Sequence, residues 1–181
     1  SESFKFKQFE IFQHKTAMKV GTDGVLLGAW VKYKNPKTIM DIGTGTGLIA
    51  LMLAQKFPEA RIYAVEIDKE ACLQASENFK NSRWSNRIEI IEADFLQFAK
   101  DTKMKFDIIV SNPPYFENHL PSLDRKRSFA RHNSQLPFDK FTDKVGSLLT
   151  EKGKFFVIIP TFYHEKFIRF CNQNLLFCTN K

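Results

Sequence analysis

The stretch SNPPYF, residues 111–116, directly follows a run that is typical of a buried strand, residues 106–110. Two consecutive prolines cannot donate hydrogen bonds to a sheet, and Pro113 disfavours a helical conformation at Asn112, so the strand must end here. The turn offers two oxygen acceptors, the Asn112 side-chain amide and the Pro113 carbonyl, and it carries the ring of Tyr115. Pro114 stiffens this arrangement. Such a rigid set of groups at a strand end indicates a role beyond chain reversal.

A glycine-rich segment, MDIGTGTG at residues 40–47, joins an expected strand to an expected helix. Gly43, Gly45 and Gly47 would allow a tight turn and the close approach of a ligand. A dinucleotide fingerprint requires its third glycine at a position that Leu48 occupies here. Asp41 at the strand end would repel a phosphate and attract a cation. The segment therefore favours a positively charged nucleoside, such as S-adenosylmethionine with its sulfonium and ammonium groups, over NAD.

Two further strand ends carry groups that suit a nucleoside. Glu66 ends the next strand, where a βαβ unit of this kind places an acid against a ribose diol, and Ile67 follows it. Asp94 ends the third strand and could accept a hydrogen bond from an adenine amino group, while Phe95 could cover the adenine face. Alternatively, Phe95 belongs to the hydrophobic core.

In this order, DIGTGTG, VEID, EADF and SNPPYF resemble the class I, Rossmann-like S-adenosylmethionine-dependent methyltransferases, over roughly residues 38–160. The NPPY motif resembles that of enzymes which methylate planar amino or amide nitrogens. The resemblance implies four catalytic residues. The Asn112 oxygen and the Pro113 carbonyl would accept the N–H bonds of the target amine, Pro114 would fix their aim, and Tyr115 would stack on an extruded base. Alternative substrates are a protein glutamine and exocyclic amines of rRNA or DNA, and a non-enzymatic nucleic-acid-binding domain is a further possibility.

The N-terminal segment resembles a bacterial group that methylates N6 of adenine 37, beside the anticodon of valine tRNA. The matching residues are Phe9, Gln13, Ala17 to Val20, Thr22, Asp23 and Leu26 to Trp30. This similarity implies that Lys19 and Thr22 lie near the methionine end of the cofactor. A competing interpretation makes Thr22 or Asp23 the N-cap of a helix.

Basic residues surround this expected site. The net charge of +7 is spread as +4 over residues 1–40, −2 over 41–110, +2 over 111–140 and +3 over 141–181. Four basic side chains follow the NPPY motif and suit RNA phosphates: Arg125, Lys126, Arg127 and Arg131. We expect tRNA, through its anticodon stem-loop, as partner of a cytoplasmic monomer without metal or membrane. The three cysteines have no zinc-site spacing and are expected to be buried.

The expected fold class is α/β, a mostly parallel sheet with helices on both faces, preceded by a β-hairpin and helix in residues 1–37. Core strands are predicted at residues 38–43, 61–67, 88–94, 106–111 and 153–160. Core helices are predicted at residues 47–57, 68–81, 137–149 and 162–174. Residues 1–181 would form a single methyltransferase domain. Residues 175–180 would begin another strand, so we expect the C-terminal end of the core to be incomplete.

Overall fold

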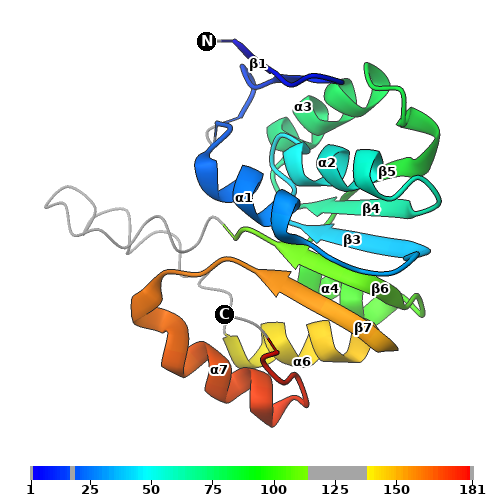
Figure 1. Cartoon of the computed structure of the whole chain (residues 1–181). Coiled ribbons are helices and arrows are strands. Elements are labelled where there is room, and N and C mark those ends of the chain that lie inside the picture. The colour runs from blue at the N-terminus through cyan, green and yellow to red at the C-terminus, as the bar shows by residue number, and fades with distance from the viewer. Residues whose placement is uncertain (1, 17–18, 114–137, 180–181) are drawn as a thin grey trace, which may run out of the picture.

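A five-stranded parallel sheet forms the centre of the molecule (Figure 1), as the sequence predicts. The computed structural model describes residues 2–16, 19–113 and 138–179. The strand order is β5-β4-β3-β6-β7, and every neighbouring pair is parallel. The strands are β3 (Thr38–Ile42), β4 (Arg61–Glu66), β5 (Ile88–Glu92), β6 (Phe106–Ser111) and β7 (Leu149–Val157). After β5 the chain crosses to the other side of β3 and adds β6 and then β7 there. The strands β3 and β6 therefore lie side by side, and their carboxyl ends are adjacent.

Helices cover both faces of this sheet, as the strand–helix alternation predicts (Figure 1). One hydrophobic cluster joins α1 (Thr22–Trp30), α2 (Leu48–Lys56) and α3 (Lys69–Lys80) to one face. A second cluster joins α4 (Phe95–Asp101), α6 (Phe138–Leu148) and α7 (His164–Gln173) to the other. Burial on both faces explains why β3 and β6 are apolar at most consecutive positions, with Asp41 and Asp107 as the charged exceptions.

Local signals place the ends of two helices where they were predicted. α2 ends at Lys56, and Pro58 follows its C-cap. Asp68 caps α3, because its carboxylate accepts a hydrogen bond from the Ala71 N–H at 2.8 Å. This cap directly follows the end of β4 and therefore fixes the chain at the rim of the expected site.

The N-terminal extension is a hairpin followed by a helix, as expected. Strands β1 (Ser3–Lys5) and β2 (Glu10–Phe12) pair antiparallel. The helix α1 packs on α2, where Gly28 lies against the Met52 side chain. The predicted N-cap at Thr22 or Asp23 is wrong, because Gly21 occupies the cap position and makes no side-chain cap bond. Thr22 and Asp23 lie in the first helical turn, with their side chains exposed.

Three further expectations need correction. Residues 95–101 form α4, a helix that was not predicted. Residues 175–179 do not form a strand. Leu175 has a positive φ of 60° and Leu176 packs against Gly146 of α6, which turns the segment away from the sheet edge. Cys178 is exposed, whereas Cys72 and Cys171 are buried as expected.

The strand predicted at residues 153–160 runs instead over residues 149–157. Its pairing with β6 is irregular, because Phe106 faces Leu149 while Ile108 faces Lys154. No helix among the described residues is long and apolar enough to cross a membrane.

Candidate active site

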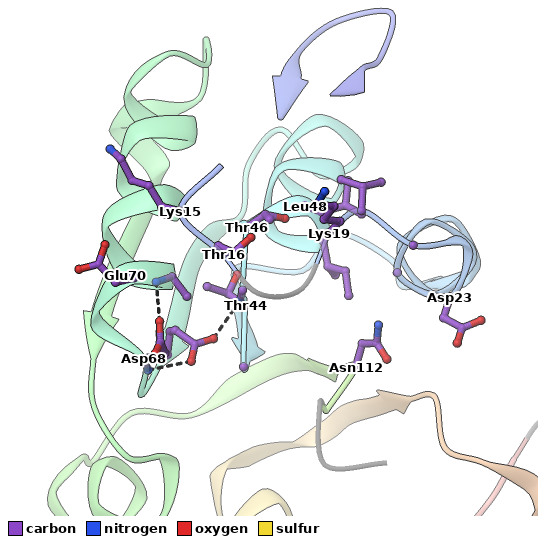
Figure 2. A pocket seen from close by; sticks show the side chains of 18 of the residues that line it. Lys15, Thr16, Lys19, Asp23, Thr44, Thr46, Leu48, Asp68, Glu70 and Asn112 are labelled. Atoms are coloured by element: carbon purple, nitrogen blue, oxygen red, sulfur yellow. Dashed lines mark hydrogen bonds between the residues drawn. The ribbon is translucent and has the colours of Figure 1, made fainter. Parts of the chain in front are cut away.

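A large cavity of about 670 Å³ opens beyond the carboxyl ends of β3, β4 and β6 (Figure 2). Its walls come from four parts of the chain that are far apart in the sequence. They are residues 15–16 and 19–24 before and in α1, the loop after β3 with the start of α2, the end of β4 with the start of α3, and Asn112 after β6. In Figure 2, Asp68 and Glu70 lie on one side of the cavity and Asn112 with Asp23 on the other. Ligands of open parallel sheets bind at this edge, where the strand order reverses.

The glycines of the loop after β3 all have a positive φ, but they do not share one role. Gly43, Gly45 and Gly47 have φ values of 70°, 56° and 83°. A Cβ at Gly45 would meet no atom within 4 Å, so this backbone is open to a ligand. A Cβ at Gly47 would lie 2.4 Å from Cε1 of Phe79, and Gly47 does not line the cavity. Gly47 is therefore required for packing against α3.

The Glu66 carboxylate is held by three backbone N–H groups. Oε2 accepts from Gly45 at 2.9 Å, while Oε1 accepts from Ile67 at 2.9 Å and from Asp68 at 3.0 Å. These bonds fix the carboxylate between the glycine loop and the start of α3. Glu66 lines the large cavity and also a smaller one beside it. It therefore stands where the two cavities meet.

Asp41 lies beneath the glycine loop and lines neither of these two cavities. Its side chain is 1% exposed, and its Oδ2 accepts a hydrogen bond from the Thr44 hydroxyl at 2.7 Å. The other oxygen, Oδ1, is buried and accepts no hydrogen bond. Burial raises the pKa of Asp41 to about 7, against the lowering effects of the Thr44 hydroxyl and the backbone N–H of Ala50, and the charge of Glu66 adds to the rise. A cation bound above the glycine loop would lower the pKa of Asp41 and favour its ionised form.

The smaller cavity, of about 60 Å³, is mainly apolar and lies on the other side of Glu66. Ile67, Asp94, Phe95 and Pro113 all line it. Asp94 caps α4, since its Oδ1 accepts from the Gln97 N–H at 2.9 Å. Phe95 is 5% exposed and packs edge-on against Phe141. Phe95 therefore belongs to the hydrophobic core, the alternative that the sequence left open. Only part of its ring surface reaches the smaller cavity.

Asn112 and Pro113 follow directly from β6 and border different cavities. Asn112 lines the larger one and Pro113 the smaller. The preceding residue, Ser111, is fully buried and donates its hydroxyl to the Ile42 carbonyl at 2.9 Å, which fixes the end of β6 to β3. Gly24 of α1 lies close to the Asn112 amide, because a Cβ there would be 3.8 Å from Nδ2.

Lys19 and Thr22, which the N-terminal similarity implied near the methionine end of the cofactor, line the large cavity, and so does Asp23. Pro114, Tyr115 and the four predicted RNA-binding residues lie outside the described part of the chain. Among the polar and charged lining residues, sequence reasoning missed Lys15, Thr16, Thr44, Thr46, Asp68 and Glu70. Asp68 and Glu70 had a usable signal, because they stand just after Glu66 at the same strand end. Within the described ranges, no group of three or more His, Cys, Asp or Glu could hold a metal ion.

The sequence of this chain is similar to that of known methyltransferases. The family model of the methyltransferase small domain matches residues 10–168. A tRNA1(Val) (adenine(37)-N6)-methyltransferase of Bacteroides thetaiotaomicron is 53% identical over 87% of this chain and 66% of its own length. The enzyme of the same name from Flavobacterium psychrophilum is 47% identical over 94% of this chain and 73% of its own length. The chain thus spans about two thirds of the curated relatives that it matches.

Solved methyltransferase structures share the fold and confirm the expected Rossmann-like class. A precorrin-6y C5,15-methyltransferase from Geobacter metallireducens has a TM-score of 0.65 at 16% identity and covers 88% of this chain and 74% of that one. TrmN from Thermus thermophilus has a TM-score of 0.59 at 20% identity and covers 83% and 40%. The chain belongs to the methyltransferase small domain family, and within it to the group of tRNA1(Val) (adenine(37)-N6)-methyltransferases.

Proposed function

We propose that this protein uses S-adenosylmethionine to methylate N6 of an adenine in tRNA, namely adenine 37 beside the anticodon of tRNA(Val). One observation carries the proposal. Asn112 and Pro113 follow the end of β6 and line two neighbouring cavities, and Glu66, an acid placed to bind a ribose, lines both of them. The identity of about 50% to enzymes of that name supports the choice of substrate.

Three features of the described residues fit the cofactor. Gly45 leaves its backbone open to a ligand, Asp41 places a buried carboxylate beneath the loop, and Glu66 retains acceptor capacity beyond its three amide bonds. When bound, S-adenosylmethionine supplies an electrophilic methyl group on a sulfonium. Glu66 would hold the ribose diol, and the larger cavity with Lys19 and Thr22 would hold the methionine part. Its volume of about 670 Å³ leaves room for the target base as well.

The remaining assignments follow from the two cavities. Ile67, Asp94 and Phe95 would surround the adenine of the cofactor, and Phe95 would contribute only the part of its ring that reaches the small cavity. Gly43 and Gly45 would shape the loop at the methionine part. Gly47 would act through its packing on Phe79 rather than by contact.

Asn112 and Pro113 would prepare the target nitrogen for reaction. The lone pair of an adenine amino group is delocalised into the ring, so the nitrogen is a weak nucleophile. Two oxygen acceptors on its N–H bonds favour a tetrahedral nitrogen and hold it in line for transfer. No strong base is required, because the product loses its proton after the methyl group has moved. Tyr115 would stack on the extruded base, and Pro114 would keep the turn rigid.

Arg125, Lys126, Arg127 and Arg131 follow the catalytic turn in sequence, and we assign them to phosphates of the anticodon stem-loop. A monomer acting in the cytoplasm, where tRNA is available, is part of the same proposal.

The experiment that tests the function uses labelled S-adenosylmethionine with unmodified tRNA(Val), the same tRNA carrying guanine at position 37, double-stranded DNA, and a peptide-chain release factor. We expect label in the unmodified tRNA alone, recovered as N6-methyladenosine on nucleoside digestion. Label in the release factor would instead assign the protein-glutamine activity. Equal labelling of the guanine-37 tRNA would contradict the position.

A further inference from the structure

The N-terminal wall of the large cavity is attached to the rest of the molecule by side-chain amides of α3. Asn78 is 1% exposed and makes three hydrogen bonds. Its Oδ1 accepts from the Phe12 N–H at 2.8 Å, and its Nδ2 donates to the Phe12 carbonyl at 2.9 Å. The same Nδ2 also donates to the Thr46 carbonyl at 2.8 Å. One buried amide therefore joins the end of β2 to the glycine loop.

Two further contacts extend this attachment along the N-terminal segment. Gln74, one turn earlier in α3 and fully buried, accepts from the Lys15 N–H at 3.0 Å. The Gln13 side chain accepts from the Val20 N–H at 2.9 Å. The segment held in this way contributes Lys15, Thr16, Lys19 and Val20 to the wall of the large cavity.

The wall adjoins the glycine loop at Asn78, whose amide bonds to Phe12 on the wall side and to Thr46 on the loop side. The loop contributes Thr44, Gly45 and Thr46 to the lining, and Asn78 bonds to the carbonyl of the last of these. On the loop side, the neighbouring Phe79 packs against Gly47. Because a buried amide with three bonds has one favourable geometry, it fixes the distance between the two sides.

We propose that Asn78 is a positioning residue that sets the width of the cofactor cavity by locking the N-terminal wall to the glycine loop. The inference rests on the proposed function, because it takes S-adenosylmethionine as the ligand between the two sides. Asn78 touches neither the cavity nor the catalytic turn. Its effect should therefore fall on cofactor affinity and leave the chemical step unchanged.

The test compares two variants of this residue with a matched control. Asn78→Ala removes all three bonds, and Asn78→Asp keeps the size and the acceptor for Phe12 but loses both donated bonds. The control is Arg87→Met. Arg87 also donates to three backbone carbonyls, those of Ala54, Phe57 and Ala60, but it directly precedes β5, at the amino end of that strand, whereas the cavity lies beyond the carboxyl ends of the strands.

We expect both Asn78 variants to raise the dissociation constant for S-adenosylmethionine about tenfold or more, measured by calorimetry at 10 °C, well below melting. At saturating cofactor, kcat and the KM for tRNA should stay within about twofold of wild type. Arg87→Met should lower the melting temperature without changing the dissociation constant.

Two results would overturn the inference: an unchanged dissociation constant in Asn78→Asp, or the same loss of affinity in Arg87→Met. Hydrogen exchange gives a second readout, because the amides of Phe12, Lys15 and Val20 should exchange faster in the Asn78 variants only. A wild-type protein that fails to bind S-adenosylmethionine would reject the proposed function itself, which separates the two failures.

Discussion

Glu66 and Gly45 are joined by a hydrogen bond of 2.9 Å from the Gly45 N–H to the Glu66 carboxylate. The bond links the end of β4 to the glycine loop after β3, so one side chain both shapes the loop and faces the cavity. A carboxylate in this position has two separable tasks. It supports the backbone through its amide bonds, and it is proposed to accept the ribose hydroxyls.

Replacing Glu66 by Ala should weaken S-adenosylmethionine binding by ~1.5–3 kcal/mol, because the ribose loses a charged acceptor. Glu66→Gln is the control that separates the two tasks, since it keeps one acceptor oxygen but removes the charge. We expect Glu66→Gln to bind with intermediate affinity in calorimetry. A dissociation constant unchanged in Glu66→Ala would count against the ribose role.

The second and third glycines of the loop after β3, Gly45 and Gly47, should respond differently to alanine. Gly47→Ala places a Cβ 2.4 Å from the Phe79 ring at a φ of 83°, and should lower the free energy of unfolding by ~2–4 kcal/mol. Gly45→Ala meets no atom within 4 Å at a φ of 56°, and should cost only ~1 kcal/mol. Its Cβ would occupy ligand space, so its cofactor affinity should fall at least tenfold. Urea unfolding and calorimetry on both variants measure the contrast, which equal stability losses would refute.

The sequence predicts the parallel sheet and the positions of Asp41, Glu66 and Asn112 because strand ends are local signals. Apolar runs, glycines and prolines mark them without any knowledge of tertiary contacts. The α4 helix was missed although Asp94 supplies a cap and Phe95, Phe98 and Ala99 have helical spacing. The helix has only seven residues, and Phe95 was considered as a ligand contact or a core residue but not as the start of a helix.

Features that depend on distant contacts could not be predicted in the same way. Residues 175–179 are apolar enough for a strand, but Leu176 instead packs over Gly146. Gln74 and Asn78 look like ordinary polar residues of α3, and only the folded chain shows that they hold residues 12–15. The different tasks of Gly45 and Gly47 are equally invisible in sequence, because they depend on where Phe79 packs.

The buried Asp41 should make stability depend on pH. Its pKa is raised from 3.8 to about 7 in the folded chain, so between these values the folded state holds a proton that the unfolded state has lost. Stability from this group therefore falls as the pH rises from about 4 to about 7, and the full cost remains above 7. Asp41→Asn should stabilise the protein more at pH 8 than at pH 4, with a difference of ~2–4 kcal/mol.

The measurement is urea unfolding of wild type and Asp41→Asn at both pH values. Thr44→Val is the companion variant, because the Thr44 hydroxyl lowers the pKa of Asp41. Its loss should raise that pKa further and make stability fall over a wider pH range. An equal gain from Asp41→Asn at pH 4 and pH 8 would show that folding does not raise the pKa of Asp41.

The basic residues after the catalytic turn should control RNA affinity. Replacing Arg125, Lys126 and Arg127 by Ala should raise the KM for tRNA and flatten its dependence on salt. Each lost phosphate contact removes a slope of about 0.7–0.9 in a plot of log affinity against log salt. Cofactor affinity should not change. An unaltered salt slope would move the RNA path elsewhere, with the Lys-rich N-terminal segment as the next candidate.

Asn112 gives the most direct test of the proposed chemistry. If its side-chain oxygen accepts an N–H of the target amine, the bond strengthens as the nitrogen becomes tetrahedral in the transition state. Asn112→Ala should therefore lower the single-turnover rate about a hundredfold or more, ~3 kcal/mol, with little change in cofactor affinity. Asn112→Asp keeps an acceptor oxygen and should retain more activity than the Ala variant.

Tyr115 provides the matched comparison, because Tyr115→Phe preserves base stacking while Tyr115→Ala should lose ~1–3 kcal/mol of it. The assay is methylation of unmodified tRNA at saturating S-adenosylmethionine, and a wild-type rate for Asn112→Ala would reduce the turn to a structural element and remove the basis for amino-nitrogen methylation.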